Sequence, residues 1–186
     1  TMETNLSAVA TLLTLAKTCG RHTLDPAELD ALLPNLGVAG RSGPASVHAI
    51  QLRFELHHTR EFGLVLRAGV GGLDGELGEG HFKPDRATVH AATALTDACD
   101  FLRLFRRTLA YQKLQHPVQG DASNSPDDWL QRCFAQLLAL AAVSTEFTLR
   151  QLRIDGVWER HQFVLTSACC EFAPPESTRL PRPIHK

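Results

Sequence analysis

The chain has 186 residues, of which 44% are hydrophobic and 21% are charged, and its formal net charge is −1. This composition is that of a globular domain and excludes a wholly disordered chain. The near-zero net charge excludes a protein whose whole surface is basic and attracts nucleic acid or an anionic membrane. The five cysteines are scattered and odd in number, which argues against a disulfide framework. We therefore expect a soluble intracellular protein, cytoplasmic or nuclear, with no signal peptide and no membrane insertion.

The first part of the chain predicts two helices followed by a β-hairpin. Apolar residues recur at helical spacing from Asn5 to Cys19, and Asp25-Pro26 opens a second helix over 27–33. Residues 47–56 then alternate between apolar and polar side chains, as a half-buried strand does, and residues 62–66 repeat this pattern. The intervening residues 57–61 would link the two strands into a hairpin.

The middle of the chain predicts a glycine-rich loop and a long helix. Residues 69–80 include six glycines and follow a strand, as phosphate-binding loops do. No Lys-Ser or Lys-Thr pair and no helix start comes next, so we expect a connector and not a nucleotide site. Asp85 can cap a helix over 86–114, whose apolar stripe runs from Val89 to Leu109. The polar residues 116–124 would form a loop.

Residues 125–143 give the strongest helix signal in the chain. Ser125 and Pro126 are typical of the first positions of a helix. Between 133 and 143, Gln136 is the only polar side chain. A helix that is apolar nearly all round should be covered on several sides, so we expect this helix at the centre of the core.

The last part of the chain predicts a second hairpin and a tail. Asp155-Gly156 separates two β-rich runs, 147–154 and 157–170. This dipeptide is typical of a type I′ turn, because both turn positions need a positive φ. Residues 174–186 lack a periodic apolar face and are rich in proline, so we expect a disordered tail after a single domain over residues 1–173.

These elements together predict an α+β fold with two β-hairpins and about four helices. The simplest arrangement joins the hairpins into one four-stranded antiparallel sheet with the helices on one face. A second arrangement, in which the hairpins stay separate on a helical core, remains open at this stage.

Histidine and cysteine could carry chemistry, but their spacing does not predict a site. His57 and His58 are adjacent on a predicted strand and so point to opposite faces, and the paired spacings of zinc sites are missing. Cys169 and His161 lie on one predicted strand, about 26 Å apart, too far to act as nucleophile and base. We predict no catalytic residue, no metal ligand and no cofactor, although a His–Cys site assembled by the fold stays open.

Arginine and tryptophan are the better candidates for contacts with a partner. Arginines follow one predicted helix and decorate the second hairpin, and with Arg53 and Arg67 they could make an outer sheet face rich in arginine. Both tryptophans lie at element ends, where they could anchor a partner or cap the core. The candidate interaction residues are Trp129, Trp158, Arg103, Arg106, Arg107, Arg150 and Arg153.

Three functions are compatible with this sequence. A non-catalytic protein–protein interaction or assembly subunit is favoured, namely an adaptor, a chaperone-like partner or a structural component of a complex, with self-association into a homodimer as one form. The alternative is a nucleic-acid or small-molecule binding module that uses the arginine-rich sheet face. Nucleic acid is not favoured, because few aromatic residues accompany the arginines. A small enzyme with a His/Cys site comes last.

Overall fold

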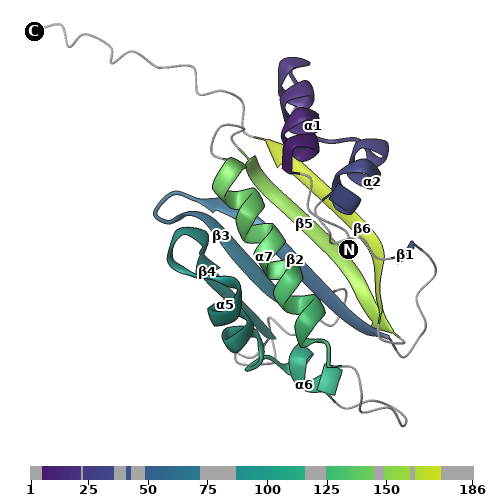
Figure 1. The fold of residues 1–186 in the computed structure, drawn as a ribbon, viewed down its shortest axis with the longest axis vertical. Coiled ribbons are helices and arrows are strands. Elements are labelled where there is room, and N and C mark those ends of the chain that lie inside the picture. The colour runs from purple at the N-terminus through teal and green to yellow at the C-terminus, as the bar shows by residue number, and fades with distance from the viewer. Residues whose placement is uncertain are drawn as a thin grey trace, which may run out of the picture.

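One antiparallel sheet with helices on one face forms the described part of the molecule, as a computed structural model shows (Figure 1). The structure describes residues 6–21, 23–35, 41–42, 49–71, 87–115, 125–144, 149–159 and 162–172. The predicted loop 116–124, Asp85, most of the glycine-rich segment and the predicted tail 174–186 lie outside these residues.

The sheet has the strand order β1-β6-β5-β2-β3-β4. Its strands are β1 (Arg41–Ser42), β2 (Ile50–Thr59), β3 (Gly63–Val70), β4 (Thr88–Ala92), β5 (Leu149–Glu159) and β6 (Gln162–Phe172). The two-residue β1 runs parallel to β6, and the other five strands are antiparallel. The predicted joining of two hairpins into one sheet is confirmed, because β2 pairs with β5. β4 and β1 were not predicted as strands.

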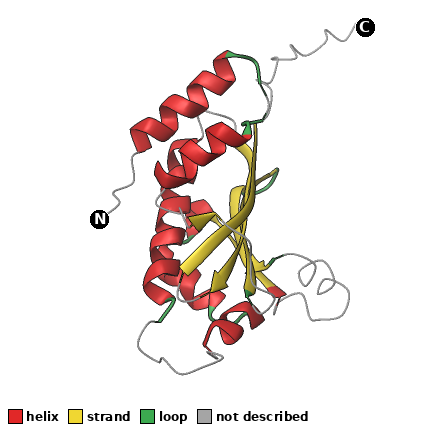
Figure 2. Ribbon diagram, turned by 90° about the vertical axis from the view of Figure 1, so that its right-hand side faces the viewer, coloured by secondary structure: helices red, strands yellow, loops and turns green. Residues whose placement is uncertain are grey.

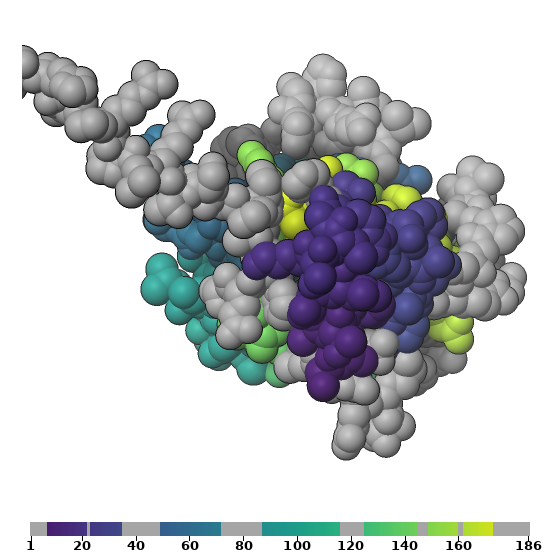
Figure 3. Space-filling view, turned by 90° about the horizontal axis from the view of Figure 1, so that it is seen from above, coloured from purple at the N-terminus to yellow at the C-terminus, as the bar shows by residue number. Residues whose placement is uncertain are grey.

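The described residues form five helices and one 3-10 turn beside the sheet, one helix more than predicted. They are α1 (Leu6–Thr18), α2 (Pro26–Asn35), the 3-10 turn η1 (Thr93–Leu95), α5 (Ala98–Phe105), α6 (Leu109–Gln115) and α7 (Asp127–Val143). Figure 2 shows the long helices on one side of the sheet, which confirms the predicted α+β arrangement. α1 and α2 pack against each other as a pair (Figure 3).

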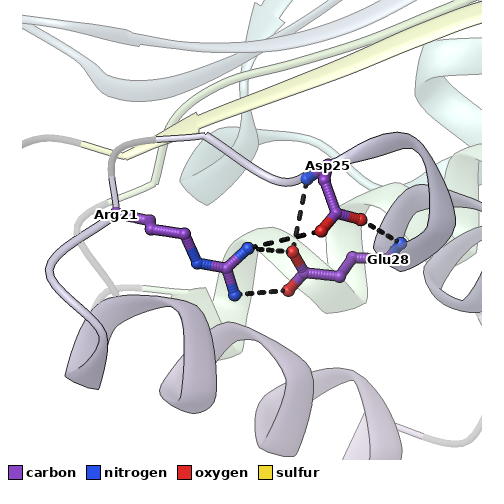
Figure 4. Close-up of polar contacts among 3 residues, drawn as sticks. All are labelled: Arg21, Asp25 and Glu28. Atoms are coloured by element: carbon purple, nitrogen blue, oxygen red, sulfur yellow. Dashed lines mark hydrogen bonds and ion pairs between the residues drawn. The ribbon is translucent and has the colours of Figure 1, made fainter.

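A capping box fixes the start of α2 (Figure 4). Asp25 accepts a hydrogen bond from the Glu28 N–H (2.9 Å), and the Glu28 carboxylate accepts one from the Asp25 N–H (3.3 Å). This reciprocal arrangement satisfies two backbone donors that a helix start leaves free. Arg21, just after α1, forms a two-pronged ion pair with Glu28, so one carboxylate joins the end of α1 to the start of α2.

The core lies between β2 and α7. Leu52, Phe54 and Leu56 alternate along β2 and are fully buried on the helix side of the sheet. The Phe54 ring meets Phe134 of α7 with ring centroids 5.8 Å apart. Because burial of a leucine or phenylalanine side chain stabilises a protein by about 1.5–3 kcal/mol, these contacts hold α7 on the sheet.

Helix α7 is central, as predicted: the sheet covers one side of it, and α5 and η1 pack beside it, with the Phe101 and Phe134 ring centroids 4.8 Å apart. Its buried residues lie on one face: Leu130, Cys133, Phe134, Leu137, Leu140 and Ala141. On the opposite face Ala135, Ala142 and Val143 are exposed. The expectation of cover on several sides therefore holds only in part, since the outward face of α7 is exposed. The helix begins after Pro126, and the predicted Ser125 hydroxyl accepts a hydrogen bond from the Asp127 N–H (3.3 Å) there.

The predicted long helix over 86–114 is wrong. Thr88–Ala92 pairs with β3 as β4, and three short helical segments follow it. The Asp97 side chain accepts from the Asp100 N–H (2.8 Å) and starts α5. The buried Thr108 hydroxyl accepts from the Tyr111 N–H (3.2 Å) at the start of α6. These two caps interrupt the apolar stripe that suggested one continuous helix.

The second hairpin exists, but its predicted turn at Asp155-Gly156 is wrong. β5 continues through this dipeptide with a shift of its register against β6, and Gly156 is not among the described glycines with positive φ. A Cβ on Gly156 would lie 2.2 Å from the Phe163 ring, so the glycine makes room for an aromatic side chain on the neighbouring strand. The reversal falls between Glu159 and Gln162, which pair with each other.

The first hairpin is confirmed, with strands longer than predicted. β2 reaches Thr59, and β3 begins at Gly63, whose φ of 66° suits glycine. The Thr59 hydroxyl accepts from the Phe62 N–H (3.1 Å) and closes the turn. β3 continues to Val70, so Gly69 belongs to the strand and not to the predicted glycine-rich loop.

Candidate functional site

The two tryptophans meet at the margin of the core. Trp129 of α7 and Trp158 of β5 have ring centroids 5.4 Å apart. Trp129 also stacks on Phe163 (4.8 Å, 27°). Both tryptophans remain half-buried, so they cap the core and still present part of each ring to the surface.

The three predicted helix arginines are all exposed, and Arg103 and Arg106 form ion pairs with carboxylates. Arg106 forms an ion pair with Asp127 (2.5 Å), which raises the pKa of the guanidinium further above its usual value. Asp127 also accepts from the Tyr111 hydroxyl (2.7 Å). This network ties the end of α5 to α6 and to the start of α7, which is a structural role. Arg103 is exposed and pairs with Asp100 (3.1 Å), and Arg107 is exposed.

The sheet face away from the helices carries most of the predicted hairpin arginines. Because Arg67 and Arg153 lie opposite Glu55, and Arg53 lies opposite Asp155, all three arginines share this face, as the sequence suggested. Arg150 is exposed near the start of β5, where the register shifts.

Carboxylates offset the positive charge of this face. Asp155 accepts from Arg53 (2.7 Å) and lies 3.2 Å from the Nε of Arg153. Glu55 accepts from Gln151 (3.3 Å) and lies 3.7 Å from Nδ1 of His57. The side chains of Glu55 and Asp155 are each only 13% exposed, which strengthens their pairing with the surrounding cations. The face is therefore a mixed-charge network and not a continuous basic surface.

Histidine and cysteine do not converge in the described part of the chain. Among the described residues there is no group of three or more side chains that could hold a metal ion. Cys133 and Cys170 are buried, and burial raises the pKa of each thiol, to about 12 for Cys170. A thiol with a raised pKa is a poor nucleophile, so these two cysteines act as small core residues.

An apolar surface on α7 and η1 was missed by the sequence analysis. We call it the α7–η1 surface and define it by six exposed or half-exposed residues: Leu95, Ala135, Leu138, Ala139, Ala142 and Val143. η1 contacts α7, and Leu95 in η1 is 83% exposed. The signal was present in the uncharged run from 133 to 143, for which the sequence predicts cover on several sides.

The α7–η1 surface has an unusual composition for an exposed helix. A surface helix normally turns charged or polar residues toward water on the side opposite the core. In the second half of α7, the exposed side holds alanine and valine instead. Small side chains let another backbone approach closely, so this side of α7 can pack against a further apolar element. No helix in the described ranges has the length and hydropathy needed to cross a membrane.

The fold is similar to solved structures of very different sequence. No protein-family model and no curated protein matches the sequence. The apo form of the Ca. Korarchaeum cryptofilum dinucleotide forming acetyl-coenzyme A synthetase 1 is similar over 89% of this chain and 100% of that chain, with TM-score 0.68 and 12% identity. PH1788 from Pyrococcus horikoshii Ot3 is similar over 91% and 99%, with TM-score 0.69 and 9% identity. At such identities the likeness shows the fold alone.

Proposed function

We propose that this chain is a non-catalytic interaction or assembly subunit that binds a protein partner through the α7–η1 surface. One observation carries the proposal: the exposed side of α7 holds no charged residue in its second half. The chain would then act as an adaptor, a chaperone-like partner or a structural component of a complex.

The chemistry of the α7–η1 surface suits an apolar helix as the contacting element. Ala135, Ala139 and Ala142 leave a shallow surface along α7, and an amphipathic helix can place larger apolar side chains against such a surface. Leu95 stands at its margin and is 83% exposed. Complete burial of one leucine stabilises a complex by about 1.5–3 kcal/mol, so a few such contacts give measurable affinity.

The alternative, a binding module on the sheet face with arginines, has weaker support. Arg53 and Arg153 are both paired with Asp155, so an anionic ligand would have to compete with a resident carboxylate. Related structures were solved in complex with coenzyme A, such as Ca. Korarchaeum cryptofilum ACD1 at 13% identity. We do not extend that ligand to this chain, because fold likeness alone does not carry a binding site.

The test is affinity capture with quantitative mass spectrometry on three forms of the chain. Ala135→Glu places a charge on the exposed side of α7, and Gln112→Glu places the same charge on an exposed position of α6 as the matched control. We expect a partner that the wild-type chain and Gln112→Glu retain and that Ala135→Glu loses at least tenfold, which corresponds to about 1.4 kcal/mol.

Two results would contradict the proposal. One is that the wild-type chain enriches no protein above a tag-only control. The other is that Ala135→Glu retains every partner as well as Gln112→Glu does. Circular dichroism melting of both variants shows whether a loss of binding reflects a loss of folding, since glutamate is well tolerated in an exposed helix.

A further inference from the structure

The two edges of the sheet are covered differently. On β6, β1 pairs with Val164 and Leu165, and the Leu24 N–H donates to the Cys170 carbonyl (3.2 Å). On the opposite side, β4 is the last strand of the described sheet, and in Figure 1 it lies at the outer margin beside β3. An edge strand presents backbone groups that can pair with another strand.

The register fixes which residues of β4 present those groups. Gly71 lies opposite Gln51 and donates its N–H to the Gln51 carbonyl (3.1 Å). In an antiparallel pair the bonding side alternates along a strand, so odd-numbered residues of β3 bond to β2 and even-numbered residues face β4. Leu66 and Ala68 therefore face β4, where they lie opposite Ala91 and Val89.

It follows that Val89 and Ala91 use their backbone groups within the sheet. The other three residues of β4, Thr88, His90 and Ala92, direct their N–H and C=O groups away from β3. These three residues are symmetric about His90. An antiparallel copy of β4 placed with His90 opposite His90 sets Thr88 opposite Ala92. The two His90 residues then bond to each other, and the Ala92 N–H meets the Thr88 C=O of the other copy, whereas the Ala92 C=O already accepts the first bond of η1.

We propose that a second copy of this chain pairs with β4 in this register and extends the sheet across a two-fold axis at His90. Such an interface is isologous, because the same strand serves both subunits. The assembly is also closed at two copies, since each copy pairs through the outer edge of its β4 and has no second β4 edge for a third copy.

The side chains of β4 favour a second copy as the occupant. The strand Thr88–Ala92 contains no Lys, Arg, Asp, Glu or Pro, which are the residues that protect exposed edges from pairing, and a copy therefore meets no like charge from Lys, Arg, Asp or Glu within it. On the helix side, Val89 and Ala91 pack against the core but remain half-buried. Pairing would set Val89 opposite Ala91 of the second copy and continue the apolar layer across the interface.

This inference does not depend on the proposed function. The α7–η1 surface lies on helical elements, whereas the β4 edge acts through backbone groups. Either one can fail while the other holds, and the variants chosen for each leave the other surface unchanged.

Sedimentation velocity on three forms of the chain tests the pairing. His90→Pro removes the one N–H at the two-fold axis, and proline is tolerated on an edge strand where its nitrogen faces away from the sheet. His90→Thr is the matched control, because it removes the imidazole and keeps the N–H. We expect wild type and His90→Thr to sediment as dimers and His90→Pro as a monomer. A monomeric wild type at millimolar concentration, or a dimeric His90→Pro, would overturn the pairing.

Amide hydrogen exchange of the wild-type chain gives a second readout that needs no variant. We expect the amides of His90 and Ala92 to exchange more slowly as protein concentration rises. The amides of Val89 and Ala91, which bond to β3, should be protected at every concentration. If the first group exchanges at the same rate in dilute and concentrated samples, β4 does not pair, even if the chain dimerises elsewhere.

Discussion

Gly156 lies within β5 at a point where a side chain would collide with the Phe163 ring. The same dipeptide contributes Asp155 to the opposite face, where it pairs with Arg53 and Arg153. A sequence that is typical of a turn thus serves two packing needs on two faces of one strand. Local turn preference did not decide its conformation, because contacts with strands far away in the sequence did.

We predict that Gly156→Ala destabilises the protein by about 1–3 kcal/mol, since an added methyl group overpacks a filled site. Chemical denaturation with guanidinium measures this change in the free energy of unfolding. Phe163→Leu shortens the obstructing ring, so the double variant should be less destabilised than the sum of the two single variants. Additive effects would show that the Val164 carbonyl oxygen, which would lie 2.6 Å from the added Cβ, excludes a side chain at position 156 and that the ring does not.

Asp25 gives a pH-dependent prediction at the same scale. The hydrogen bond from the Glu28 N–H lowers the pKa of the Asp25 carboxyl below its ordinary value of 3.8. A lowered folded-state pKa means that the ionised form stabilises the fold above the unfolded-state pKa and that this contribution is lost as pH falls through the folded-state value.

Asp25→Asn keeps an oxygen that can cap α2 but removes the charge. We expect its melting temperature to lie below that of wild type at pH 7 and the difference to shrink as the pH falls below 3.8. Asp30→Asn, an exposed change on the same helix, is the control. A difference that stays constant from pH 7 to pH 2 would contradict the assigned role of the carboxylate.

At the scale of single elements, α7 shows how composition can mislead. The run from 133 to 143 lacks charge on every side, and composition alone assigns all of it to the core. The structure buries one face and leaves the other uncovered, because the sheet supplies only one apolar surface for the helix. The helix itself was predictable from local signals. Its exposed side was not, because exposure depends on which elements pack around it.

We predict that Leu137→Ala costs about 2–5 kcal/mol of unfolding free energy, because Leu137 is 1% exposed and its removal leaves a cavity. Leu138→Ala on the same helix is the control and should cost clearly less, since Leu138 is only half-buried. Urea denaturation of both variants measures the difference. Equal losses would mean that the two sides of α7 are buried to the same degree.

β4, unlike α7, is an element that local sequence signals did not predict. Thr88–Ala92 is five residues long, and its apolar positions also fit a helix. Pairing with β3 is what makes this segment a strand. The stretch of sequence that separates β3 from β4 carries no strand signal, so nothing local predicts the pairing. The candidate site was missed for the same reason, because both the β4 edge and the α7–η1 surface are defined by what does not cover them.

For the whole molecule, the alternation in 50–56 and 62–66 was sufficient to predict a hairpin. The α+β class followed because apolar residues repeat with a strand period in some segments and with a helix period in others. The register between β2 and β5 could not be predicted. Arg53 and Asp155 are joined by a 2.7 Å hydrogen bond although 102 positions separate them, and nothing local to either residue indicates the other. The arginines were correctly expected on one face, but the carboxylates that neutralise them there became visible only once the strands were aligned.

The central position of β5 has a consequence for synthesis on the ribosome. β2 and β3 are translated long before β5, and until β5 emerges the inner edge of β2 has no neighbour. One edge of β2 therefore stays unpaired while Thr88–Val143 is synthesised. Contacts between residues so far apart in the sequence slow folding. An arrested product that ends before Leu149 would carry Leu52, Phe54 and Leu56 on a strand that is paired with β3 on one side only. Quality-control machinery that recognises exposed β edges would find in this intermediate an edge that β5 covers in the finished protein.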